Sequence, residues 1–152
     1  MTDLAGIIAG CGAFQEAAGV EDREDALREF VHYPLQDHLS IPNRFPFAVL
    51  TSQEHSEERL SGNCFLPSGT IRLFLGRVIV DSAADPREAE TEFQNFAGEI
   101  IEAILDKSGD GGHFVWIPSQ IAPPSRTDAR HDCSPEIPAF YEVIYDCQWS
   151  AV

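Results

Sequence analysis

Residues 86–107 form one amphipathic segment whose apolar side chains recur at every third or fourth position. This spacing places them on one stripe of an α-helix over about five turns, and such a stripe is stable only against another apolar surface. The stripe consists of Ala89, Phe93, Phe96, Ala97, Ile100, Ile101, Ile104 and Leu105. The opposite side carries the acidic residues Glu90, Glu92, Glu99, Glu102 and Asp106. We therefore predict one long helix that covers the apolar side of another element.

Residues at both ends of this segment fit the preferences of helix termini. Asp85 suits the N-cap, Pro86 suits the first helical position, and Glu88 stands three residues after the cap, as in a capping box. Lys107 falls in the last turn, and Gly109 follows as a stop. The helix is thus predicted to begin at Pro86 and to end at Lys107.

The second strong pattern is the closing segment, residues 139–149, in which apolar and polar side chains alternate. Alternation with a period of two predicts a β-strand with one buried face. The apolar face would hold Tyr141, Val143, Tyr145, Cys147 and Trp149. The mostly polar face would hold Phe140, Glu142, Ile144, Asp146 and Gln148. We expect this strand inside a sheet, under the long helix, because its apolar face requires burial; a position at an exposed edge is the alternative.

Weaker patterns predict elements in the first part of the chain. The first 33 residues are predicted to be helical in two pieces, one along the apolar spacing of residues 4–14 and one over residues 21–33. Residues 47–50 form a short apolar run that is typical of a strand. The polar residues 51–59 are predicted to leave the sheet.

A β-hairpin is predicted over residues 60–80, with its turn at residues 67–69, and a further strand at residues 114–117. Residues 118–138 are rich in proline and lack periodicity, so they are predicted to form a long loop. This order of elements predicts a single α+β domain over residues 1–152. A mainly antiparallel sheet would be packed on one face by helices.

The charge of the chain limits its partners. It has 25 acidic residues against 10 Lys and Arg, a formal net charge of −15. A surface this acidic repels nucleic-acid phosphates and anionic membranes, which argues against tight wrapping of nucleic acid. No apolar run reaches the length of a membrane span, and the N-terminal apolar patch lacks the basic flank of a signal peptide. We expect a protein made in the cytosol, without membrane contact.

Motifs that carry chemistry are scarce. The residues that could ligate a metal are Cys64, His113, His131, Asp132, Cys133 and Cys147. Their spacing matches no zinc arrangement. No GxSxG, GxGxxG or GxxxxGK[ST] motif occurs, and no set of residues pairs a nucleophile with a base. We therefore predict no catalytic site, no cofactor and no metal.

The basic residues are isolated and do not form the basic stripe with interleaved aromatic residues of a nucleic-acid site. Arg126 and Arg130 stand out, because a basic loop on an acidic protein can dock on an acidic neighbour. The residues predicted to contribute to an interface are Arg72, Arg77, Arg126, Arg130 and His131.

Taken in order, these elements resemble the tail terminator proteins of long-tailed bacteriophages and the related minor tail and tail-completion proteins. The similarity is carried by "FPFAVL" at residues 45–50, "TIRLFLGRVIV" at 70–80, the long helix, and the closing "FYEVIYDCQW" at 140–149. It covers most of the chain. Residues 118–138 and the four cysteines depart from the family pattern.

The resemblance implies a structural role. Such proteins form a ring, typically of six copies, that caps the tail tube, ends its growth and offers a surface to the head. The implied partners are other copies of the chain, the major tail tube protein and a head-completion or connector protein. The implied location is the virion, at the head–tail junction, after assembly in the host cytoplasm. DNA would pass through the acidic ring without specific binding.

Other interpretations stay open at this point. The chain could be another head–tail connector or a tail tube component of such a virion. It could instead be a small cytosolic metal-dependent enzyme that uses His131 and Cys133. An acidic adaptor that works as a monomer or dimer is the last alternative.

Overall fold

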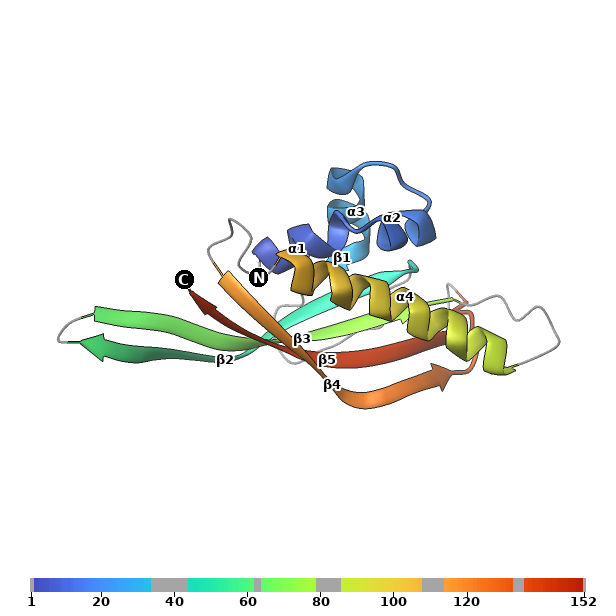
Figure 1. The fold of residues 1–152 in the computed structure, drawn as a ribbon. Coiled ribbons are helices and arrows are strands. Elements are labelled where there is room, and N and C mark those ends of the chain that lie inside the picture. The colour runs from blue at the N-terminus through green and yellow to red at the C-terminus, as the bar shows by residue number, and fades with distance from the viewer. Residues whose placement is uncertain are drawn as a thin grey trace.

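The computed structural model describes residues 2–33, 44–61, 64–78, 86–107, 114–132 and 136–151, with the backbone alone for residues 54–61, 64–66 and 86. The assignments made above to Asp85, Gly109, His113 and Cys133 lie outside these residues. The described chain has an α+β fold in which a five-stranded sheet is covered on one face by helices (Figure 1). This confirms the fold class predicted from the sequence.

Three short helices open the fold: α1 (Thr2–Ala9), α2 (Gly12–Ala18) and α3 (Arg23–Phe30). The prediction of one continuous helical piece over residues 4–14 is therefore wrong. Cys11 separates α1 from α2 because its backbone is extended, with φ −71° and ψ 128°. Gly10 and Gly12 on either side lower the helix propensity at this point.

The second predicted helical piece, residues 21–33, is also shorter than expected. Asp22 is the N-cap of α3, and its side chain accepts a hydrogen bond of 3.0 Å from the N–H of Glu24. After α3 the chain becomes extended and forms β1 (Val31–His32), which pairs in parallel with β2 (Phe47–Ser61). The β-branched first residue of β1 favours this change from helix to strand.

The remaining strands are β3 (Cys64–Arg77), β4 (Phe114–Thr127) and β5 (Phe140–Ala151). Their order in the sheet is β1-β2-β3-β5-β4, and every pair except β1 with β2 is antiparallel. The closing strand β5 therefore lies between β3 and β4, which confirms its predicted position inside the sheet.

The predicted hairpin has different bounds. Residues 51–59 do not leave the sheet, because β2 continues to Ser61 and pairs with β3 along its whole length. The turn predicted at residues 67–69 is wrong: Pro67 pairs with Glu57 and Gly69 with His55, both inside the β2–β3 ladder. This part of the hairpin projects past the described helices (Figure 1), so no described helix covers it and its sequence needs no apolar alternation.

The prediction of a loop over residues 118–138 is wrong for residues 118–127. β4 continues through this proline-rich stretch to Thr127. Proline is tolerated here because β4 is an edge strand, and its register with β5 shifts between Gln120 and Ala122 and again before Ser125. Of the described residues in this stretch, 128–132 and 136–138 lie outside a named strand, and an antiparallel bridge joins Arg130 to Ile137.

The long helix α4 (Pro86–Lys107) has the predicted bounds. Its buried side chains are Ala89, Phe93, Phe96, Ala97, Ile100 and Ile104. Leu105, also assigned to the apolar stripe, is 51% exposed. It lies about 140° around the helix axis from Ile100, at the margin of the stripe.

One core fills the space between the helices and the sheet. The ring of Phe93 stacks on that of Tyr141, with centroids 5.7 Å apart, and Phe14 of α2 packs on Phe96 at 6.4 Å. The predicted apolar face of β5 is confirmed, since it supplies Tyr141, Val143, Tyr145 and Cys147 as buried residues and Trp149 as a half-buried one.

A second, smaller apolar cluster lies on the opposite face of the sheet, where mostly polar side chains were predicted. Phe47, Val49 and Phe140 are buried there. Phe45, just before β2, packs on Phe140 with ring centroids 5.0 Å apart, and Ile137, just before β5, joins the same cluster. These flanking segments cover one end of this face, and Phe140 is buried for that reason. Among the described helices, none combines the length and hydropathy needed to cross a membrane.

Candidate assembly interface

The sheet has two edges, and proline distinguishes them. β4 forms one edge and contains Pro118, Pro123 and Pro124, which have no backbone N–H to offer a further strand. At the other edge β1 pairs only with the start of β2, and residues 50–61 of β2 contain no proline. Within the described chain no strand pairs with the outer side of residues 50–61. This edge can therefore accept a strand from another molecule.

The β2–β3 hairpin extends beyond the rest of the sheet. β5 accompanies β3 only as far as Ser68, which pairs with Ser150. Beyond that point residues 57–61 and residues 64–67, here called the arm, pair only with each other among the described residues. Figure 1 shows this hairpin reaching past the helices at the left of the view. A two-stranded hairpin is only marginally stable alone in water, so a partner along the arm would stabilise it.

The arm was not predicted from the sequence, because the polar residues 51–59 resemble a loop in composition. One signal was present. Residues 51–61 contain neither proline nor glycine, the two residues that most often interrupt a strand.

Of the predicted interface residues, Arg72 lies on the face of the sheet that points away from the helices. It is the direct cross-strand partner of Asp146 on β5. Its Nε donates to Asp146 Oδ1 at 2.9 Å and its Nη2 donates to Oδ2 at 3.2 Å. The hydrogen bond with Asp146 raises the pKa of Arg72, so the guanidinium stays charged.

Arg77 and Arg126 lie on the opposite face, on either side of Tyr141. Both are register partners of Tyr141, Arg77 from β3 and Arg126 from β4, and directly opposed residues share a face. Arg77 reaches α4, where its Nη2 is 3.7 Å from a carboxylate oxygen of Glu92. Arg126 Nε is 3.9 Å from the Oδ1 atom of Asp128.

Arg130 and His131 follow β4 in the segment that returns toward β5. Arg130 Nε is 3.7 Å from Asp132, and His131 Nδ1 is 3.4 Å from Glu136. The structure thus brings Arg77 and Arg126 to one face and leaves Arg72 on the other. All five predicted interface residues have a carboxylate neighbour within the chain, so none adds surplus positive charge to the surface.

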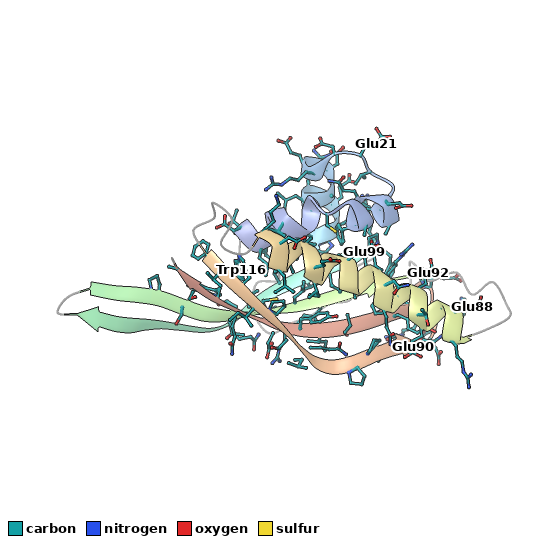
Figure 2. All side chains as sticks on the ribbon, viewed as in Figure 1. Glu21, Glu88, Glu90, Glu92, Glu99 and Trp116 are labelled. Atoms are coloured by element: carbon teal, nitrogen blue, oxygen red, sulfur yellow. The ribbon has the colours of Figure 1, made fainter. Side chains whose placement is uncertain are left out.

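The exposed side of α4 is acidic, as predicted. Four of the predicted carboxylates recur at helical spacing and form one stripe together with Glu88: Glu92, Glu99, Glu102 and Asp106. Glu90, also predicted on this side, lies about 160° around the helix axis from Glu92 and is not part of the stripe. Figure 2 shows Glu88, Glu92 and Glu99 spread along the length of α4. This acidic stripe gives the helical face of the protein a charge that repels other anions.

Within the described residues, no group of three or more His, Cys, Asp or Glu side chains is placed to hold a metal ion. Cys147 is fully buried in the core, and burial raises the pKa of its thiol to about 12, with a further contribution from Asp146. A thiol in such surroundings is an inert core group.

Comparison with known proteins assigns no family to this chain. No protein-family model matches the sequence, and no curated protein matches it. The free edge of β2, the arm and the charge distribution are therefore the observations that bear on function.

Proposed function

We propose that this protein is a structural component of a long-tailed bacteriophage virion and acts as its tail terminator. Copies of the chain would form a ring, typically of six, that caps the tail tube, ends its growth and offers the surface that joins the head. The observation that carries the proposal is the arm, whose strands pair with no other described strand along their outer sides. Such an edge pairs readily with a strand of a neighbouring chain.

The two unlike edges of the sheet support a ring. A closed ring with head-to-tail contacts needs two different surfaces on each copy. The edge of β2 and the proline-bearing edge of β4 lie at opposite ends of the sheet order. Arg126, Arg130 and His131 lie at the end of β4 or just after it, where an acidic neighbour would dock. Their present ion pairs are long and partly exposed, so exchanging partners costs little free energy.

The charge of the protein supports the same role. An acidic ring does not neutralise DNA phosphates, so no counterions are released and DNA slides past without binding. The acidic stripe on α4 is the surface that we assign to the lumen. The major tail tube protein and a head-completion protein are the proposed partners on the two sides of the ring.

Electron microscopy of negatively stained tail tubes mixed with the purified protein tests this role. The proposal predicts a cap at one end of each tube, with a diameter set by a ring of copies. Decoration along the tube, or none, would contradict it. Self-polymerisation of the protein into tubes would instead assign it to the tail tube itself.

A shortened arm provides the matched variant. Replacing residues 57–67 by Asn-Gly joins Ser56 and Ser68, which are register partners, through a two-residue turn. Ser68, unlike Pro67, has the backbone N–H that such a turn needs. The variant is expected to fold, because the core lies elsewhere, and to lose the cap on tail tubes. Arg28→Gln, which removes an exposed ion pair on α3, is the control and should cap normally.

A further inference from the structure

A pocket of about 390 Å³ lies between the N-terminal helices and the C-terminal end of α4. Arg23, the first residue of α3, and Lys107, the last residue of α4, both line it. No acidic side chain is among the residues that line it. In a chain with a net charge of −15, a pocket with two cations and no carboxylate stands out.

These two cations also differ from the arginines that form ion pairs. The arginines with a carboxylate at 2.7 to 3.9 Å are Arg28, Arg44, Arg72, Arg77, Arg126 and Arg130. Arg23 and Lys107 have no ion pair and no hydrogen bond in the part of the chain that the structure describes. Both of these unpartnered cations face the same pocket.

Other donors in the pocket are already engaged. The Nε2 atom of Gln15 donates to the carbonyl oxygen of Ala9 at 2.9 Å. The thiol of Cys11 donates to the carbonyl oxygen of Glu99 at 3.9 Å. The groups left to bind a ligand are thus the guanidinium and the ammonium group, and both carry a full positive charge.

The guanidinium of Arg23 is held close to the backbone of α1. Gly6 makes this possible, because a Cβ atom at that position would collide with Arg23 Nη2. The aliphatic part of Arg23 runs past Gly10, where a Cβ atom would lie 3.6 Å from Arg23 Cδ.

We propose that this pocket is a binding site for an oxyanion, a carboxylate or phosphate group. The planar guanidinium can donate two parallel hydrogen bonds to such a group, and the ammonium adds a compact charge beside it. The volume suits a small ligand or the end of an acidic side chain. This site does not depend on the proposed role in the tail.

Titration of the full-length protein with inorganic phosphate and with succinate, by calorimetry at low ionic strength, tests the proposal. Saturable binding of at least one probe is expected. Arg23→Gln and Lys107→Gln should each weaken binding about tenfold, since each removes a charge-assisted hydrogen bond. Arg28→Gln, on the same helix as Arg23 and paired with Asp25, should bind as the parent does. Absence of saturation would overturn the proposal. So would an affinity of the Arg23 and Lys107 variants equal to that of the parent protein.

Sedimentation of the same variants distinguishes the two sources of the oxyanion. If a carboxylate of a second copy occupies the pocket, phosphate and both substitutions should weaken self-association as well. If the ligand is a free anion, self-association should be unchanged while phosphate or succinate binding is lost. Either result supports the site, and neither depends on whether the protein caps tail tubes.

Discussion

The ring of Phe93 on α4 lies stacked on the ring of Tyr141 on β5, with centroids 5.7 Å apart and an interplanar angle of 28°. The contact joins the long helix to the closing strand. Phe93 is fully buried, so Phe93→Ala should lower the free energy of unfolding by about 3–5 kcal/mol. Urea denaturation measures the loss. Leu105→Ala on the exposed margin of the same helix should change stability by less than about 1 kcal/mol; equal losses in both variants would contradict this packing.

The pair formed by Arg72 and Asp146 should contribute measurably to stability. It has two hydrogen bonds and both side chains are partly buried, so a double-mutant cycle should give a coupling of about 1 kcal/mol. Coupling in the exposed pair of Arg28 with Asp25 should be close to zero. A stronger coupling in the exposed pair would show that the cross-strand geometry adds nothing.

Cys147 should resist thiol reagents in the folded protein. Its thiol pKa is raised from 9.0 to about 12, which lowers the thiolate fraction about a thousandfold, and the side chain is fully buried. Peptide mapping after iodoacetamide treatment should find Cys147 unmodified under native conditions and modified in denaturant. Rapid native labelling would place Cys147 outside the core.

Glu142 should make stability fall as the pH rises. It is partly buried on the face of the sheet that points away from the helices, and burial raises the pKa of its carboxyl above the ordinary value of 4.5. The folded state then binds the proton more tightly than the unfolded chain, so stability is lost as the pH rises from 4.5 through the folded pKa. Glu142→Gln should therefore raise the free energy of unfolding at pH 7 and have little effect well below pH 4.5. A loss of stability at pH 7 would contradict a burial cost at this carboxylate.

Long regular patterns were the part of the fold that the sequence predicted well. α4 has the bounds expected from its apolar stripe, and β5 has the buried face expected from its alternation. Both signals repeat over many residues and reflect burial on one side only. Such signals do not depend on which element supplies the opposite surface.

Elements whose structure depends on their neighbours were predicted poorly. Pro118, Pro123 and Pro124 suggested a loop, yet β4 accepts them because it has a partner on one side only. The polar residues 51–59 also suggested a loop, yet they form part of β2 and pair with β3. Whether a strand lies at an edge is decided by the whole sheet. Prolines are compatible with an edge strand, but they do not distinguish it from a loop.

The candidate sites show the same limit. The arm exists because β5 ends at a point that only the register defines. The pocket joins Arg23 and Lys107, which are far apart in the chain and belong to no motif. The basic residues chosen from the sequence proved to be paired with carboxylates, and their role at an interface stays a prediction.

Assembly through the free edge and the arm is the central claim, and hydrogen–deuterium exchange tests it most directly. Backbone amides of residues 50–61 and 64–66 that do not donate within the β2–β3 ladder should exchange rapidly in the free protein. In protein bound to tail tubes these same amides should become protected, because each would donate to a neighbouring chain. Identical exchange in the free and tube-bound protein would contradict the claim.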